Sequence, residues 1–135
     1  MSVFIKWNRE YSVQDGLLDD QHKKIYELIN QLHAALKDRE ADHQLTQRIM
    51  KQLTEYTLKH FSAEERLMAK YGYPKLNDHK ELHQQMSRRT RELSRQVMNT
   101  NSDDAHEILM FLKNWWQQHI LKQDMQYVPL SKWEK

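Results

Sequence analysis

The chain of 135 residues contains no cysteine and has only two glycines and two prolines. The absence of cysteine excludes disulfide bonds, thiolate zinc sites and iron–sulfur clusters. So few glycines and prolines supply little material for tight turns, and the sequence therefore favours long helices with short connections. The length is enough for one domain with a real core, and too short for two comfortable ones.

The sequence also lacks a dominant charge and a long apolar run. It has 21 basic and 19 acidic residues, and both signs are mixed along the chain. We therefore expect no nucleic-acid partner, because such proteins carry a basic patch or stripe. No apolar run approaches the roughly 20 residues of a membrane span, and residues 1–7 lack the apolar core of a signal peptide. We expect a cytoplasmic protein with no membrane association.

Apolar residues recur at intervals of three and four along four segments, which is the spacing of amphipathic helices. Gly72, followed by Pro74, is the expected stop after the second segment. Asp19 or Asp20 is the expected N-cap of the first. Short connections between these segments favour an all-α, up-down-up-down four-helix bundle.

We expect this bundle to occupy residues 18–126 of a single domain that covers residues 1–135. Residues 1–17 contain too many apolar side chains for a free tail, so we expect an N-terminal arm packed along the bundle. Residues 127–135 form a C-terminal tail that docks on the bundle or frays. We expect the protein to be a monomer.

Five histidines and two acidic residues have the spacing of metal ligands on helices. His60 and Glu64 are four residues apart, so both lie on one helix face, and the periodicity makes that face the buried one. His79 and His83 are also four residues apart, and His22 continues the apolar face of the first helix. The seven residues are His22, His60, Glu64, His79, His83, His119 and Asp124.

A lone histidine on an apolar face is more often a hydrogen-bonded core residue than a metal ligand. Here that reading must hold for five histidines, and it must also explain the acid at position 64. Acidic side chains are almost never fully buried unless they are paired or bound to metal. Five imidazoles and two carboxylates are too many for one ion, so the set favours a pair of transition-metal ions in a helical core.

His119 and Asp124 do not share a face of a regular helix. Five residues turn an α-helix by roughly 500°, which leaves the two side chains about 140° apart. Two arrangements would still bring Asp124 to the metals. Either a π-type bulge realigns the two residues, or Asp124 approaches from the end of the helix.

Two other metal motifs do not fit. A zinc-protease helix needs a glutamate directly after the first histidine, and Lys80 follows His79. The ferritin-like di-iron class needs two Glu-x-x-His pairs, and the one match, Glu40 to His43, lies in a polar connection. We assign no metal to the remaining histidines, which are His33, His43 and His106.

The ordered pattern resembles that of the hemerythrins, in particular the single-domain bacteriohemerythrins. It consists of His22 after an acidic-Gln start, then His-x-x-x-Glu, His-x-x-x-His and His-x-x-x-x-Asp. The similarity covers nearly the whole chain. It extends to Trp7 in the arm, the pair Glu64–Glu65, the segment 71–74 and Trp115, four residues before the last histidine.

This resemblance implies a site with two iron ions, cycling between ferrous and ferric states, and an oxo or hydroxo bridge. It implies that dioxygen binds there reversibly. By the same resemblance, one iron is bound by His79, His83 and His119. The other iron is bound by His22 and His60. The carboxylates of Glu64 and Asp124 bridge the two irons.

Two octahedral irons offer about twelve coordination positions. With the implied ligands and a bridging hydroxide, one position stays open, on the iron that has only two imidazoles. A dry pocket around that position opposes charge separation and so retains the bound gas. The candidate residues for its lining are Ile25, Leu28, Phe61, Trp115 and Trp116.

Trp116 departs from the family pattern, because many relatives have an aliphatic residue directly after the tryptophan of the last helix. If its ring points at the metals, the oxygen pocket is smaller or reshaped. If it points at a neighbouring helix, it is ordinary core, and this is the arrangement that we expect.

The function that we infer is reversible dioxygen binding for oxygen delivery, storage or sensing. An oxygen-consuming protein is then the expected partner. We expect no enzyme, because we find no general acid or base on the core face besides the ligands. The alternatives are a di-iron oxidase or peroxidase, and an iron-storage or repair module, each of which would use the same centre.

Overall fold

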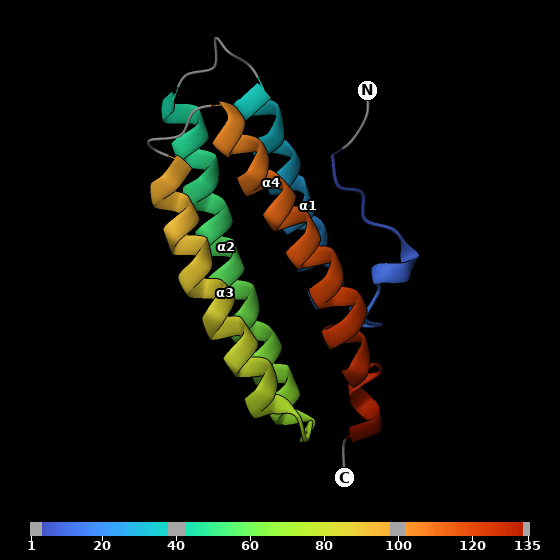
Figure 1. Ribbon diagram of the computed structural model, residues 1–135. Coiled ribbons are helices and arrows are strands. Elements are labelled where there is room, and N and C mark those ends of the chain that lie inside the picture. The colour runs from blue at the N-terminus through green and yellow to red at the C-terminus, as the bar shows by residue number, and fades with distance from the viewer. Residues whose placement is uncertain (1–3, 38–42, 98–101, 134–135) are drawn as a thin grey trace.

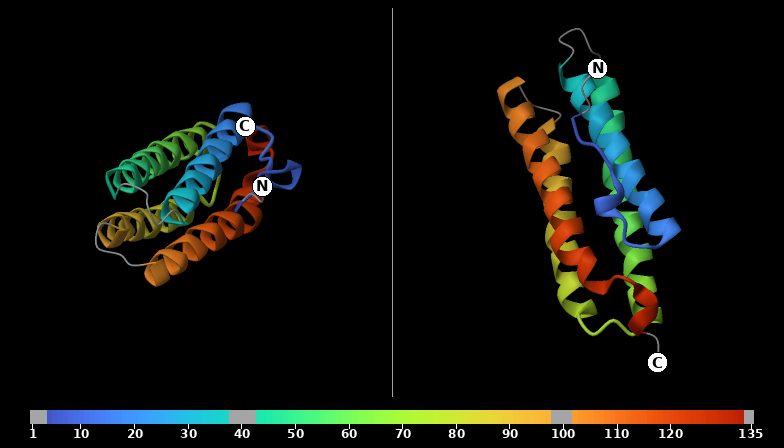
Figure 2. Two further views of the ribbon diagram at one scale, coloured as in Figure 1. Left: turned by 90° about the horizontal axis from the view of Figure 1, so that it is seen from above. Right: turned by 90° about the vertical axis from the view of Figure 1, so that its right-hand side faces the viewer.

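The computed structural model describes residues 4–37, 43–97 and 102–133. Within these residues four long helices run alternately up and down and pack as a bundle (Figure 1). Seen from above, they surround a common interior (Figure 2). The predicted all-α four-helix bundle is therefore confirmed. The helices are α1 (Gly16–Lys37), α2 (His43–Lys70), α3 (Leu76–Val97) and α4 (Ser102–Gln118).

Helix α1 begins at Gly16, two residues before residue 18, where we expected the bundle to start. The Asp15 carboxylate accepts a hydrogen bond of 3.0 Å from the backbone N–H of Leu18, as an N-cap does. The predicted cap at Asp19 or Asp20 is wrong. Asp19 instead accepts a bond of 2.8 Å from the backbone N–H of Val13, which fastens the arm to the first turn of the helix.

Helix α2 ends at the predicted glycine. Gly72 has a φ of 69°, a left-handed conformation that glycine adopts without steric penalty. The N–H of Tyr73 donates to the carbonyl of Met68 at 2.9 Å, and that of Gly72 donates to Ala69 at 3.2 Å. These two bonds form the Schellman arrangement that closes a helix and turns the chain towards α3.

The N-terminal arm lies along α1 and contains one short helix, η1 (Arg9–Tyr11) (Figures 1 and 2). Its main anchor is Asn30 of α1. The side chain of Asn30 accepts a bond of 2.9 Å from the N–H of Ile5 and donates one of 2.8 Å to its carbonyl. The side chain of Ile5 is 1 % exposed, so the arm contributes to the core.

After α4 the chain continues through a π-helical segment and two 3-10 turns. Tyr127, which we assigned to the tail, is fully buried, so the predicted boundary after residue 126 falls inside the core. The indole N–H of Trp133 donates to the carbonyl of Tyr127 at 3.0 Å. The described part of the tail therefore docks on the bundle. These segments are η2 (His119–Gln123), η3 (Asp124–Tyr127) and η4 (Leu130–Trp133).

Two apolar clusters fill the interior, and polar residues separate them along each helix. On α1, Leu18 belongs to one cluster and Ile25 to the other, with His22 between them. On α2, Phe61 and Met68 flank Glu64 in the same way. The bundle thus holds a layer of buried polar side chains between two apolar layers. In the described part of the chain, none of the helices is both long and apolar enough to cross a membrane.

Candidate metal centre

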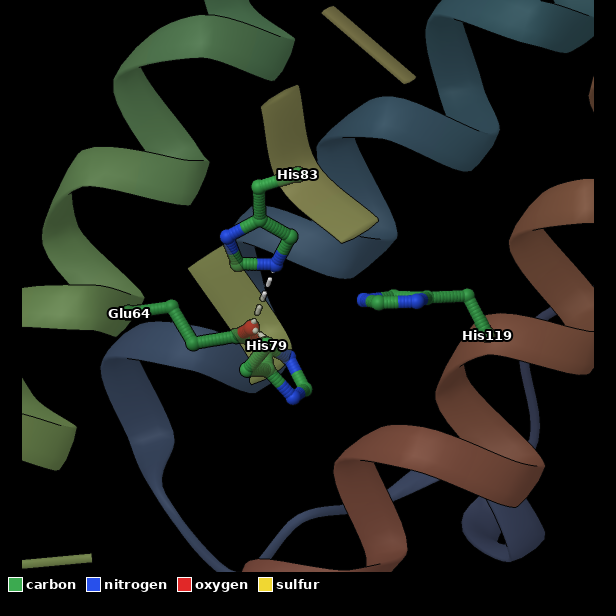
Figure 3. Close-up of side chains that lie close together, drawn as sticks. All are labelled: Glu64, His79, His83 and His119. Atoms are coloured by element: carbon green, nitrogen blue, oxygen red, sulfur yellow. Dashed lines mark hydrogen bonds and ion pairs between the residues drawn. The ribbon is translucent and has the colours of Figure 1, made fainter. Parts of the chain in front are cut away.

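The seven sequence-predicted ligand residues lie together in this polar layer. None of them is more than 5 % exposed. Figure 3 shows four of them, with Glu64 from α2 and His119 from the start of η2 facing the two histidines of α3. The full set is His22, His60, Glu64, His79, His83, His119 and Asp124.

Glu64 lies between two groups of histidines and presents a different oxygen to each. Its Oε1 is 2.8 Å from Nε2 of His79 and 3.1 Å from Nε2 of His83. Its Oε2 is 3.4 Å from Nε2 of His60 and 3.8 Å from Nε2 of His22. One carboxylate therefore spans both groups.

Asp124, at the start of η3, likewise presents a different oxygen to each group of histidines. Its Oδ1 is 2.9 Å from Nε2 of His79 and 3.1 Å from Nε2 of His119. Its Oδ2 is 3.3 Å from Nε2 of His22. The histidines thus divide into one group of three and one group of two, and each carboxylate offers one oxygen to either group.

Several of these atoms have no hydrogen-bond partner among the described residues. They include both oxygens of Asp124 and Nε2 of His22, His83 and His119. Buried polar atoms are nearly always hydrogen-bonded, so unpartnered atoms at such short mutual distances indicate lone pairs directed at a shared point. Two sets could each hold a cation, with Glu64 common to both. The donor set therefore fits two neighbouring metal ions.

The π-helical segment η2 explains how Asp124 reaches the centre. The backbone N–H of Asp124 donates to the carbonyls of His119 and Ile120, five and four residues earlier. The bond across five residues widens the turn, which brings Asp124 onto the face of His119. Of the two arrangements that the sequence left open, the π-type bulge is confirmed.

Two of the histidines are oriented by hydrogen bonds to Gln21 and Glu65, which are adjacent in sequence to His22 and Glu64. Nδ1 of His60 lies 2.6 Å from Oε1 of Gln21, and Nδ1 of His83 lies 2.9 Å from Oε2 of Glu65. An acceptor at Nδ1 fixes the proton there and leaves the Nε2 lone pair free to face the centre. Neither partner was predicted from the sequence. Their only signal is that Gln21 precedes His22 and Glu65 follows the buried glutamate.

Tyr127 is a further residue that the sequence analysis missed. Its hydroxyl donates a hydrogen bond of 3.2 Å to Oε2 of Glu64. Burial and the charges of Glu64 and Asp124 raise the pKa of Tyr127 well above its usual value, so the hydroxyl stays protonated. A buried tyrosine hydroxyl therefore contacts a predicted ligand, at a position that the helical pattern did not indicate.

In the absence of metal, the carboxylates hold a proton on the cluster. Burial alone would lower the pKa of His79, but the adjacent carboxylates of Asp124 and Glu64 raise it to about 10. Burial also disfavours ionised Glu64, yet the adjacent imidazoles of His60, His79 and His83 keep its pKa well below the usual value. The carboxylates are thus anionic at neutral pH, as metal ligands must be.

Aromatic rings cover the group of three histidines. Phe61 stacks on His83 with ring centres 3.9 Å apart, and Trp115 stacks on His119 at 4.3 Å. Ile25 and Leu28, on α1, are 0 % and 3 % exposed. Their role as pocket lining, with that of the aromatic residues, stays a prediction.

Trp116 packs against α2, because its ring lies 5.6 Å from that of Phe61. Its ring also lies 6.0 Å from His60 and 6.3 Å from His22. Trp116 is therefore both a core residue and a neighbour of the group of two histidines.

The histidines that we left unassigned lie away from the centre where their side chains are described. His33 stacks on Phe4 of the arm with ring centres 4.3 Å apart, and His106 is exposed. The side chain of His43 is outside the described residues.

Comparison with known proteins places this geometry in a family. A model of the hemerythrin HHE cation-binding domain matches residues 14–131. A bacteriohemerythrin of Pseudomonas aeruginosa is 34% identical over 122 residues, which are 90% of this chain and 78% of that protein. A bacteriohemerythrin of Clostridium acetobutylicum is 29% identical over 125 residues, which are 90% of this chain and 97% of that protein.

Solved structures of hemerythrins have the same fold. The crystal structure of a wild-type hemerythrin has a TM-score of 0.82 at 27% identity, and covers 94% of this chain and 97% of that one. A hemerythrin variant with tyrosine in place of a leucine has a TM-score of 0.84 at 28% identity, and the match covers 96% of this chain and 99% of the variant. The chain belongs to the hemerythrin family, and its buried cluster of histidines and carboxylates is a candidate metal centre of a cation-binding domain.

Proposed function

We propose that this protein binds dioxygen reversibly at a non-haem di-iron centre formed by the seven buried residues. The observation that carries the proposal is the division of both carboxylates between two groups of histidines. Glu64 and Asp124 each offer one oxygen to either group, as two carboxylates that bridge two cations would. A single-ion site would not need acids that face both ways.

In this proposal, the group of three histidines holds one iron and the group of two holds the other. Imidazole and carboxylate ligands suit iron, although the same ligands also accept other divalent ions. The group of His22 and His60 supplies one imidazole fewer than the other group, so the centre would have room for the small molecule on that side. Bound ferrous ions would supply the electrons that dioxygen takes up on binding and returns on release.

The protein positions the ligands and excludes water. Gln21 and Glu65 fix the rings of His60 and His83 through their Nδ1 atoms. Tyr127 holds Glu64 with its hydroxyl, and the stacked rings of Phe61 and Trp115 cover the outer side of the histidines. A dry, preorganised site of this kind favours a bound gas over loss of a charged product to water.

One observation favours the alternative of a di-iron oxidase or peroxidase. Tyr127 places a buried hydroxyl on Glu64, and a hydrogen-bond donor at this position can stabilise negative charge that develops at the centre during turnover. Nothing in the geometry singles out iron storage. Oxygen delivery, storage or sensing as the biological role, a monomeric state and a cytoplasmic location stay predictions.

The test is to load the protein with ferrous iron without air and mix it with dissolved dioxygen in a stopped-flow spectrometer. Two irons per chain, and an absorption band that persists and disappears under argon, would support the proposal. Rapid irreversible oxidation with release of peroxide, or steady consumption of a reductant, would favour the oxidase. Failure to retain two irons per chain would overturn both.

A further inference from the structure

Trp116 has a buried indole N–H with no hydrogen-bond partner among the described residues. The side chain is 0 % exposed, and its ring borders those of His60 and His22 at 6.0 Å and 6.3 Å. A buried tryptophan usually finds an acceptor for this group, because an unpaired donor in an apolar interior is destabilising. The N–H of Trp116 thus lacks an acceptor among the described residues, although its ring borders both histidines of the group of two.

A second unpartnered group lies one helical turn before His60. Thr57 is 1 % exposed, and its Oγ1 has no partner in the described part of the chain. Other threonines in these helices behave differently, because Thr54 and Thr90 donate to the carbonyl four residues back at 2.9 Å and 2.8 Å. Thr57 therefore keeps its hydroxyl available on the inward face of α2.

The two sides of the centre differ in this respect. The group of three histidines is covered by the stacked, apolar ring faces of Phe61 and Trp115. Beside the group of two, two helices each contribute a buried polar group without a partner. The unpartnered donors of Trp116 and Thr57 therefore lie beside the group of two histidines, which is also the group with fewer ligands.

We propose that Trp116, assisted by Thr57, donates a hydrogen bond to the small molecule that binds beside His22 and His60. The site then selects diatomic or linear triatomic ligands that carry a hydrogen-bond acceptor and partial negative charge, and it disfavours apolar ligands of the same size. Indole is only a donor, so Trp116 stabilises the charge without giving up its proton. This inference rests on the proposed di-iron function.

The probe for this proposal is azide, a linear anion, added to the protein with both irons oxidised. We expect Trp116→Phe to bind azide roughly tenfold or more weakly than the wild type, the effect of one hydrogen bond to a charged group. The infrared stretching band of bound azide should shift between H2O and D2O in the wild type, and this shift should shrink in Trp116→Phe. Thr57→Val should weaken azide binding less.

Trp7→Phe is the matched control, because Trp7 also has a buried indole N–H without a described partner. Its ring lies in the arm, 4.5 Å from the Nζ atom of Lys23, on the outer side of α1. We expect azide affinity and the D2O shift of Trp7→Phe to equal those of the wild type. A loss equal to that of Trp116→Phe would overturn the proposal.

The outcomes separate this proposal from the proposed function. If the wild type retains no iron, the proposed function and this inference both fail. If the wild type retains two irons but binds no azide, this inference alone fails. If the wild type binds azide but its band is unchanged in D2O, Trp116 donates no bond and this inference alone fails. That measurement uses only the wild type, so it decides the question even if Trp116→Phe does not fold. Unchanged azide binding by a folded, iron-loaded Trp116→Phe would also overturn it.

Discussion

The hydroxyl of Tyr127 donates a hydrogen bond of 3.2 Å to Oε2 of Glu64, across 63 positions of sequence. Oε2 is the oxygen that faces His60 and His22. Tyr127 therefore joins η3 to one of the two carboxylates of the candidate metal centre. It fixes the orientation of Glu64 before any cation binds.

We predict that Tyr127→Phe keeps the fold but destabilises it. The ring still fills its place in the core, but Glu64 loses a donor, and a buried hydrogen bond to a charged group is worth about 1–3 kcal/mol. Urea unfolding of the metal-free protein should show this loss. Tyr71→Phe is the control, because Tyr71 is only half-buried and its hydroxyl makes no hydrogen bond within the described part of the chain. Equal stability of the two variants would contradict this assignment.

The sequence could predict which residues gather at the centre, because helical spacing determines which face a side chain occupies. His60 and Glu64, or His79 and His83, need only a regular helix to point the same way. The position of Asp124 could not be decided in this manner, since a π-helical turn and a helix end both remained open. The structure shows the π-helical turn.

The partners of the histidines could not be predicted, because they depend on how each ring rotates and how the helices pack. Gln21 bonds His60 from another helix, 39 positions away, and nothing in the local sequence indicates that pairing. Tyr127 was missed for a related reason. It follows the irregular segment η2, where the helical period no longer shows which side chains face inward.

Glu65 should be required for tight metal binding through its bond to Nδ1 of His83. We predict that Glu65→Leu weakens iron retention by roughly 10–100-fold, the usual effect of losing such a partner. Glu65→Gln should retain most of the affinity, because its amide oxygen can still accept the Nδ1 proton. Competition with a chelator measures both. If Glu65→Gln and Glu65→Leu lose iron equally, metal retention depends on the negative charge of Glu65. In that case its role as a hydrogen-bond acceptor for His83 would not explain the effect.

The metal-free protein should lose stability as the pH rises from about 6.5 towards 10. In the folded protein, the adjacent carboxylates of Asp124 and Glu64 outweigh the effect of burial and raise the pKa of His79 to about 10, whereas an unfolded histidine has a pKa of about 6.5. A raised folded pKa stabilises the fold fully below the unfolded value, and this contribution disappears as the pH approaches the folded value.

Urea midpoints of the metal-free protein between pH 6.5 and pH 10 test this prediction. The decline should be smaller in metal-free His79→Gln, which cannot carry the proton. The iron-loaded wild type should also decline less, because the metal replaces the proton on the histidines. A flat profile for the metal-free wild type would show that the cluster holds no such proton.

The two glycines of the chain should respond in opposite ways to substitution by alanine. Gly72 has a φ of 69°, and alanine in this left-handed conformation costs about 1–2 kcal/mol. The added Cβ would lie 3.7 Å from the carbonyl oxygen of Trp133, an ordinary contact, so the loss comes from the backbone alone. Gly16 lies in the first turn of α1, and a Cβ there meets no atom within 4 Å. Thermal unfolding should therefore show Gly72→Ala destabilised and Gly16→Ala unchanged or slightly stabilised.

The π-helical segment η2 should tolerate the loss of one residue. A π-bulge is a regular helix with one residue inserted, so removal of Lys122 would restore an α-helical turn. His119 and the aspartate would then be four residues apart, and both would still face the centre. We predict that the protein without Lys122 folds and retains two metal ions per chain. Lys122 is exposed, so its side chain contributes little to the core.

The control for this deletion is removal of Asn114, another exposed residue, from the regular part of α4. Without it, every later side chain turns by about 100° about the helix axis, which moves His119 and Asp124 out of the centre together. We expect this variant to lose metal and much of its stability, as measured by metal analysis and thermal unfolding. If removal of Lys122 is as damaging as removal of Asn114, the centre depends on the widened turn itself and not only on the direction in which Asp124 points.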